Sequence, residues 1–189
     1  MEKDYRIQKI LFKKEEIESR IAEIAKWIET TYENSDEIVI IGVLKGAAVF
    51  LMELIKHINK IDVNIDFIIA KSYFGGSQSS GSLKIITDID TDIKGKDVIL
   101  LDDILDSGIT LAKIRDHLLL KKPKSLKLIP LFNKKVERKH DIQIDYYGIE
   151  VPNQFLVGYG LDFDDKFRNW PFVAVFDPNA KKGNSNDKS

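Results

Sequence analysis

The chain of 189 residues is long enough for one domain with a substantial core, and its 43% hydrophobic content is ordinary for a globular protein. The absence of cysteine excludes a disulfide framework, a thiol nucleophile and a thiolate metal site. A net charge of −1, from 29 basic and 30 acidic side chains, argues against a nucleic-acid partner.

The two ends of the chain carry no membrane signal. Residues 1–6 lack the apolar core of a signal peptide, and the longest apolar run, residues 38–44, is far too short to span a membrane. We therefore expect a cytoplasmic protein. Residues 179–189 contain a single apolar residue, so we expect one domain over residues 1–178 followed by a disordered tail.

Apolar residues recur with a helical period near the N-terminus. After a mixed entry segment, residues 1–12, which we expect to pack onto the body, the isoleucines from Ile17 to Ile28 are spaced four, three and four apart. This spacing predicts a packing helix over residues 13–31.

A run rich in isoleucine and valine over residues 37–43 predicts a buried strand. It leads through Leu44, Lys45 and Gly46 into an apolar helix that we expect to end near Ile58. A Lys-Gly pair by itself is also compatible with a tight turn and a solvated lysine.

A third strand is predicted over residues 63–70. The segment after it, residues 71–82, is dominated by glycine and serine, so we expect it to be mobile without ligand. The chain then returns as a strand over residues 83–89. Later strands are predicted over residues 125–132, 145–151 and 173–176, and the repeated order of strand, helix and strand predicts a parallel α/β sheet.

The loop after the central strand holds the densest group of polar side chains. Residues 98–101 predict a strand buried on both faces, and residues 110–120 predict a helix. Between them lie three carboxylates, two hydroxyl groups and a glycine: Asp102, Asp103, Asp106, Ser107, Gly108 and Thr110. A helix N-terminus at the carboxyl end of a parallel strand binds anions, so this loop predicts a phosphate site.

The carboxylates in this loop suggest two further tasks. Asp102 and Asp103 are suited to accept hydrogen bonds from vicinal ribose hydroxyls and to ligate a divalent cation such as magnesium. Asp106 is placed for proton transfer.

The segment from Val98 to Leu111 resembles the phosphoribosyl-pyrophosphate-binding signature of the type I phosphoribosyltransferases. The shared pattern is four apolar residues, two acidic residues, two apolar residues, Asp-Ser/Thr-Gly, one variable residue and Thr. Four further motifs, in the family's order, extend the resemblance over about residues 5–177. It implies a twisted, mainly parallel sheet flanked by helices, with a small hood from about residues 1–12 and 134–178.

Within this family the chain resembles the hypoxanthine-guanine branch, which implies a set of contacts to phosphoribosyl pyrophosphate. The loop at Lys45 and Gly46 would bind pyrophosphate, often with a cis peptide ahead of the lysine, and Arg168 would reach the same group. Ser72 and Tyr73 would begin a mobile lid that touches pyrophosphate and excludes water. The full implied set is Lys45, Gly46, Ser72, Tyr73, Asp102, Asp103, Asp106, Ser107, Gly108, Ile109, Thr110 and Arg168.

The resemblance also implies a purine site. Lys134 would donate to the exocyclic oxygen of a 6-oxopurine and so disfavour adenine, whose amino group is itself a donor. Phe155 would stack on the purine face, and the backbone carbonyls of Leu156 and Asp162 would accept from the ring and from any 2-amino group. The carboxylate of Asp162 would hold a second magnesium ion through water.

These resemblances imply an enzyme of purine salvage. It would transfer the 5-phosphoribosyl group from phosphoribosyl pyrophosphate to hypoxanthine, guanine or both, giving IMP or GMP and pyrophosphate. Asp106 would be the catalytic base and Mg²⁺ the cofactor, held by Asp102, Asp103 and Asp162. The family implies a homodimer or a homotetramer.

Two alternatives stay open. A xanthine-preferring transferase would use Lys134 and Phe155 equally well, because the contacts to the 2-position are made by the backbone. A regulator of the same fold would sense phosphoribosyl pyrophosphate or bind RNA, although the presence of Asp106 and the near-zero net charge argue against it. The chain differs from the hypoxanthine-guanine branch at Asp102, where glutamate is usual, so the first acid of the pair has a shorter side chain.

Overall fold

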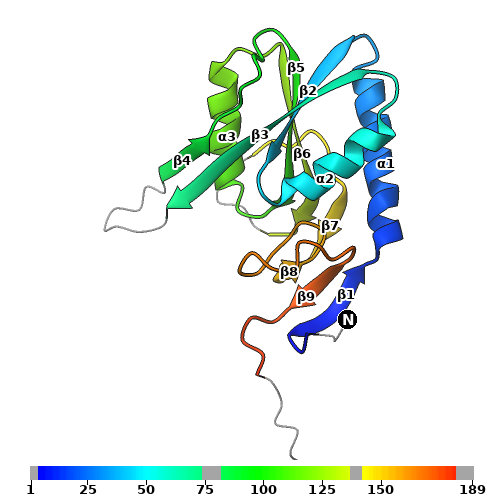
Figure 1. The fold of residues 1–189 in the computed structure, drawn as a ribbon, viewed down its shortest axis with the longest axis vertical. Coiled ribbons are helices and arrows are strands. Elements are labelled where there is room, and N and C mark those ends of the chain that lie inside the picture. Colours follow the sequence, from blue (N-terminus) through cyan, green and yellow to red (C-terminus); the bar gives the residue numbers. More distant parts are fainter. Residues whose placement is uncertain (1–3, 74–81, 137–141, 182–189) are drawn as a thin grey trace, which may run out of the picture.

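The computed structural model describes residues 4–73, 82–136 and 142–181, and within these ranges the strands form two sheets (Figure 1). The larger sheet has the order β4-β3-β2-β5-β6-β7, in which β4 is antiparallel to β3 and the other neighbours are parallel. This confirms the predicted mainly parallel sheet. Its strands are β2 (Glu37–Val43), β3 (Asp62–Tyr73), β4 (Ser82–Thr87), β5 (Asp97–Leu105), β6 (Ser125–Lys134) and β7 (Ile149–Val151).

The smaller sheet is antiparallel and lies below the larger one in Figure 1. Its strands, in spatial order, are β1 (Ile7–Phe12), β9 (Val173–Phe176) and β8 (Leu156–Val157). We call this sheet, together with the loop of residues 158–172 between β8 and β9, the hood. Because β7 extends the larger sheet beside β6, the hood takes its strands from the start of the chain and from residues 156–176.

Helices cover both faces of the larger sheet (Figure 1). One core cluster joins this sheet to α1 (Lys14–Thr31) and α2 (Ala47–Leu54), and the other joins it to α3 (Ile109–Leu120). Alternate residues of β2 divide between the two clusters, since side chains of a strand point to opposite faces. The predicted isoleucine stripe of α1 is fully buried.

The second helix is shorter than the sequence suggested. After Leu54 the chain tightens into a 3₁₀ turn over Ile55–His57 instead of continuing as α-helix to Ile58. Within the described ranges, no helix is long and apolar enough to cross a membrane.

The order of strands reverses between β2 and β5. The chain passes from β2 to β3 on one side of the sheet and later to β5 on the other side of β2. In open α/β sheets, ligands bind outside the carboxyl ends of the strands at such a point. The loops that follow β2 and β5 meet there. The strand β5 runs on to Leu105, past the predicted end at residue 101, so Asp102 and Asp103 lie in the carboxyl-terminal part of the strand and not in the loop.

Candidate active site

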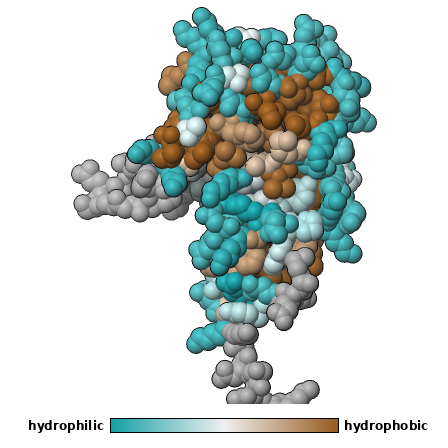
Figure 2. Space-filling view, in the orientation of Figure 1, coloured by the Kyte–Doolittle hydropathy of each residue, from teal (hydrophilic) through white to brown (hydrophobic). Residues whose placement is uncertain are grey.

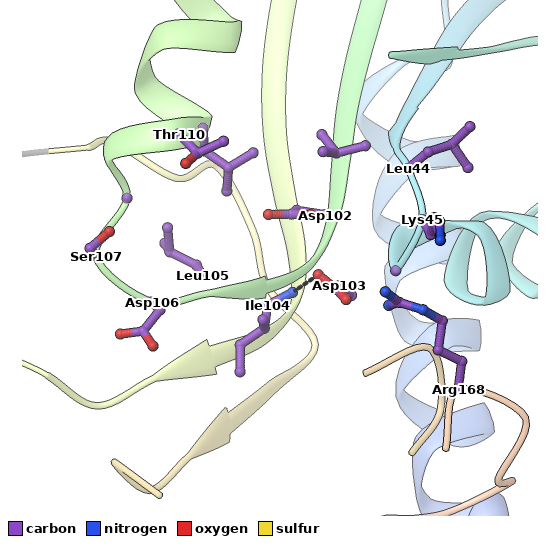
Figure 3. Close-up of a pocket in the computed structure, with 14 residues that line it drawn as sticks. Leu44, Lys45, Asp102, Asp103, Ile104, Leu105, Asp106, Ser107, Thr110 and Arg168 are labelled. Carbon is purple, nitrogen blue, oxygen red and sulfur yellow. Dashed lines mark hydrogen bonds between the residues drawn. The ribbon is translucent and has the colours of Figure 1, made fainter. Parts of the chain in front are cut away.

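A cavity of about 290 Å³ opens at this reversal point (Figure 3). The loop after β2, the carboxyl end of β5 with the loop after it, and one hood arginine line it. The structure thereby brings together residues that are far apart in the sequence, and among the predicted site residues the lining includes Lys45, Gly46, Asp102, Asp103, Asp106, Ser107, Gly108, Thr110 and Arg168. Ile109 begins α3 beside the cavity but is not among the lining residues.

The segment of residues 106–110, which we call the phosphate loop after the site predicted there, turns at Gly108, whose φ of 77° is a left-handed conformation that favours glycine. The turn directs the chain into α3, and the Gly108 carbonyl accepts from the Ala112 N–H at 2.9 Å. The first N–H groups of α3 therefore lie next to the cavity and have no partner within the helix. A helix N-terminus in this position can hold a phosphate group.

The acid pair lies at the base of the cavity. Asp103 Oδ1 accepts from the Ile104 N–H at 2.8 Å, and the side chain points toward Lys45 and Arg168 in Figure 3. Burial raises the pKa of Asp102 well above its usual range, and the neighbouring Asp103 charge raises it further. Burial also raises the pKa of Asp103. Two carboxyl groups in such surroundings favour a bound proton or cation.

The loop after β2 approaches this acid pair closely. The peptide bond between Leu44 and Lys45 is cis, as the resemblance implied. A Cβ atom at Gly46 would overlap the carboxylate of Asp103, so the close approach requires glycine. Gly46 therefore fixes how near the loop comes to the acid pair.

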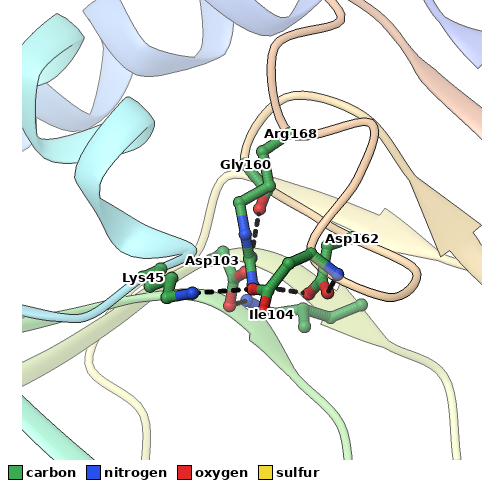
Figure 4. Close-up of polar contacts among 7 residues, drawn as sticks. Lys45, Asp103, Ile104, Gly160, Asp162 and Arg168 are labelled. Atoms are coloured by element: carbon green, nitrogen blue, oxygen red, sulfur yellow. Dashed lines mark hydrogen bonds and ion pairs between the residues drawn. The ribbon is translucent and has the colours of Figure 1, made fainter.

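A network of charges joins this loop to the hood (Figure 4). Arg168 Nη1 donates to the Gly160 carbonyl at 2.7 Å, and Nη2 lies 2.8 Å from Asp162 Oδ1. Lys45 Nζ and Arg168 Nη2 both reach Asp165 Oδ1, at 2.9 Å and 3.3 Å. The ammonium of Lys45, and then the guanidinium of Arg168, hold the pKa of Asp165 below its usual range.

Sequence reasoning missed Asp165. A signal was present, because this carboxylate stands three residues from both Asp162 and Arg168, so a tight turn could bring the three side chains together. Nothing in the spacing, however, indicated that it would meet Lys45, which lies 120 residues away.

Lys134 and Asp106 form an ion pair across neighbouring strands. Leu105 is paired with Asn133 in the sheet, so the residues that follow each of them lie side by side. Lys134 Nζ donates to Asp106 Oδ2 at 2.7 Å. The Lys134 side chain is only 13% exposed, whereas that of Asp106 is 56% exposed, so the pair presents the carboxylate to solvent.

The other predicted purine residues lie in the hood or, in the case of Phe155, directly before its strand β8. Phe155 is 44% exposed, and its ring contacts Phe163 and Phe176, whereas Leu156 is buried in β8. Neither is among the residues lining the cavity. Ser72 and Tyr73 end β3, paired with the start of β4, and the rest of the expected lid, residues 74–81, lies outside the described residues.

The three predicted metal ligands do not form one cluster. In the described parts of the chain, no group of three or more histidine, cysteine or acidic side chains is arranged to hold a metal ion. Asp102 and Asp103 line the cavity, whereas Asp162 is bound to Arg168. Two adjacent carboxylates nevertheless suit magnesium, which commonly takes one or two protein carboxylates and completes its shell with substrate oxygens and water.

Comparisons with known proteins show what the chain as a whole is similar to. The model of the phosphoribosyl transferase domain family matches residues 8–164. The hypoxanthine-guanine phosphoribosyltransferase of Aquifex aeolicus is 48% identical over 88% of this chain and 93% of its own. A crystal structure of the enzyme of that name from Bacillus anthracis is 44% identical, with a TM-score of 0.82 over 89% of this chain and 97% of its own.

A more distant solved structure shares the fold. It is a variant of the hypoxanthine phosphoribosyltransferase of Trypanosoma cruzi in a ternary complex with substrates. It is 33% identical to this chain, with a TM-score of 0.86 over 93% of this chain and 98% of its own.

Proposed function

Since the chain belongs to the hypoxanthine-guanine phosphoribosyltransferases of purine salvage, we propose that its cavity joins a 6-oxopurine to the phosphoribosyl group of phosphoribosyl pyrophosphate. The imidazole nitrogen of the purine would attack the anomeric carbon as the bond to pyrophosphate breaks, which inverts that carbon. One observation carries this proposal: a single cavity combines a helix N-terminus, an acid pair and two cations. These are the groups that a sugar carrying phosphate at one end and pyrophosphate at the other requires.

Each part of the substrate has a matching element. Residues 106–110 would hold the 5′-phosphate at the N-terminus of α3. Asp102 and Asp103 would orient the ribose hydroxyls. Lys45 and Arg168 would bind the pyrophosphate and stabilise the negative charge that grows on it as the bond breaks.

Asp106 would accept the proton that the purine loses. Its carboxylate is more than half exposed and lies next to Lys134. The purine and the carboxylate that accepts its proton would therefore meet at the start of the phosphate loop. Lys134 would donate to the exocyclic oxygen of the purine and select against adenine. Phe155, which is partly exposed beside the hood, would stack on the purine. The backbone carbonyls of Leu156 and Asp162 would accept hydrogen bonds from the ring and from any 2-amino group.

The acid pair fits Mg²⁺. Its possible metal ligands are the carboxylate oxygens of two half-buried residues that line one cavity, and a hard divalent cation prefers such oxygen ligands. Asp102 and Asp103 would hold one ion together with substrate oxygens, and Asp162 would hold a second through water. Bound magnesium would neutralise charge on the pyrophosphate. Calorimetric titration of Mg²⁺ with and without phosphoribosyl pyrophosphate tests this independently of turnover, since binding should strengthen when the substrate is present.

The reaction is tested by incubating the protein with phosphoribosyl pyrophosphate, Mg²⁺ and each of hypoxanthine, guanine, xanthine and adenine. We expect turnover of hypoxanthine or guanine, with adenine inert. Preferred turnover of xanthine would change the substrate assignment. Tight binding of phosphoribosyl pyrophosphate without turnover of any base would favour the regulator.

We also propose that the chain is a homodimer or a homotetramer, and that a hydrophobic area over β3 and α2 takes part in assembly (Figure 2). Val49 and Met52 of α2 are 37% and 46% exposed. Exposed apolar clusters of this kind mark association surfaces. Analytical ultracentrifugation of the wild type and of Met52→Lys tests this. The wild type should sediment as an oligomer and the variant should associate more weakly.

A further inference from the structure

The two cations proposed to bind pyrophosphate already share an anion of the protein. Asp165 Oδ1 accepts from Lys45 Nζ at 2.9 Å and lies 3.3 Å from Arg168 Nη2. Lys45 follows β2 of the larger sheet, whereas Asp165 and Arg168 belong to the hood loop. One carboxylate oxygen thus bridges two cations from separate parts of the fold, which is the contact that a pyrophosphate oxygen would make there.

The hood loop holds this carboxylate in place at a conformational cost. Asp164, Asp165 and Phe167 have φ values of 53°, 57° and 75°, in the left-handed region that residues other than glycine rarely adopt. Aspartate tolerates this region better than most residues, and such backbone outliers concentrate at functional sites. Asp162 Oδ2 accepts from the Asp165 N–H at 2.9 Å and so fixes the loop independently of the Asp165 side chain.

The contacts of Asp165 are the exchangeable ones in this network. Arg168 has two shorter contacts, to the Gly160 carbonyl at 2.7 Å and to Asp162 at 2.8 Å. The Asp165 side chain is 65% exposed, compared with 31% for Asp162. The Asp165 carboxylate can therefore rotate into solvent while Arg168 remains held by Gly160 and Asp162.

We propose that Asp165 is an internal competitor for the pyrophosphate group. Its carboxylate occupies Lys45 and Arg168 in the free enzyme, gives way when pyrophosphate or phosphoribosyl pyrophosphate binds, and returns to the cations as pyrophosphate leaves. This role rests on the proposed function, because it takes Lys45 and Arg168 as the pyrophosphate ligands. The consequence is that Asp165 weakens product binding and so favours release.

The test compares Asp165→Asn with Asp164→Asn. Both substitutions remove one negative charge from adjacent residues in the same backbone conformation, and asparagine also tolerates that conformation. Asp164 makes neither of the contacts to Lys45 and Arg168 described for Asp165. Binding of inorganic pyrophosphate in the presence of Mg²⁺ is measured by calorimetry for the wild type and both variants.

We expect Asp165→Asn to bind pyrophosphate roughly fivefold more tightly than Asp164→Asn. A change in affinity of this size matches the free energy of an exposed ion pair. Equal affinity of the two variants would overturn the proposal, and weaker binding by Asp165→Asn would instead make Asp165 a positioning residue. Asp165→Glu, which keeps the charge, should restore wild-type affinity. If the wild type itself fails to bind pyrophosphate, the result contradicts the proposed roles of Lys45 and Arg168, and with them the proposed function. This outcome differs from equal affinity of the two variants, which contradicts only the role of Asp165.

Discussion

Lys134 Nζ lies 2.7 Å from Asp106 Oδ2, so the cation proposed to recognise the purine and the carboxylate proposed to accept its proton are direct partners. They come from neighbouring parallel strands, β6 and β5, and meet where those strands end. A purine bound between them would receive a hydrogen bond from Lys134 and give up a proton to Asp106. On the proposed roles, recognition of the purine and its deprotonation would therefore depend on one pair of side chains.

Replacing Asp106 by asparagine removes the proton acceptor and keeps the side-chain shape. We expect turnover to fall on the order of 100-fold or more, as loss of a general base does. Binding of phosphoribosyl pyrophosphate should persist, because the backbone of residues 107–110 still forms the phosphate loop. Steady-state kinetics and a direct binding measurement check the two halves of this prediction, and unchanged turnover would remove Asp106 from the role of base.

Replacing Lys134 by glutamine should relax discrimination against adenine. An amide can accept from the adenine amino group as well as donate, whereas an ammonium can only donate. The measurement is the ratio of turnover with hypoxanthine to turnover with adenine. Lys135→Gln is the matched control, since Lys135 is 77% exposed and its partner is Glu150. An identical ratio in both variants would argue against the contact between Lys134 and the purine.

The sequence predicted the larger sheet well because its strands are strongly patterned. The apolar runs at residues 37–43 and 98–101 are buried on both faces, and the isoleucine stripe of α1 has an unambiguous period. The signature of residues 98–111 likewise located the phosphate loop, because its residue types are tied to the geometry of a strand that turns into a helix.

Other features depend on contacts between distant parts of the chain. The residues of β1 by themselves predicted only a packing segment, and its place in the hood came from the resemblance, because its partner β9 is more than 160 residues away. The ion pair between Lys45 and Asp165 joins residues 120 positions apart, and no local pattern encodes it. The strand β3 also continues to Tyr73, three residues past its predicted end at residue 70, because pairing with β4 extends it beyond its apolar run.

Replacing Gly46 by alanine should disable the site without unfolding the protein. A Cβ atom at this position would overlap the Asp103 carboxylate, so either this carboxylate or the loop that carries Lys45 must shift, and both belong to the site. Because a misplacement of about 1 Å at a catalytic site costs on the order of 100-fold, we expect a loss of turnover of that size. Affinity for phosphoribosyl pyrophosphate should fall as well.

The control for this substitution is Gly95→Ala. Gly95 has a φ of 71° and no atom within 4 Å of an added Cβ, so alanine there adds backbone strain away from the site. We expect Gly95→Ala to lower the melting temperature and to keep wild-type turnover. If Gly46→Ala retained full activity, the close contact between Gly46 and Asp103 would be unimportant for function.

Asp97 should make stability depend on pH in the acid range. It is 6% exposed and is bound by Lys124 Nζ at 2.7 Å, Ser125 Oγ at 2.7 Å and Ser35 Oγ at 2.8 Å. Burial opposes the charged form, but Lys124 and the two hydroxyl groups outweigh it and keep the pKa of Asp97 below its usual value. Because the folded state lowers the pKa, Asp97 stabilises the fold above the unfolded pKa of about 3.9 and loses that contribution as the pH falls through the folded value.

Denaturation of Asp97→Asn with urea at pH 7 and at pH 3 tests this assignment. At pH 7 the variant should be less stable than the wild type by about 1–3 kcal/mol, the usual cost of breaking a buried network of hydrogen bonds to a charged group. The difference should shrink at pH 3, because this pH lies below the unfolded pKa of about 3.9 and protonation of the unfolded carboxylate removes part of the stabilisation. Asp62→Asn is the control, because Asp62 is exposed and its loss should change stability little at either pH. A constant difference between wild type and Asp97→Asn across this range would show that the charge of Asp97 contributes nothing to the fold.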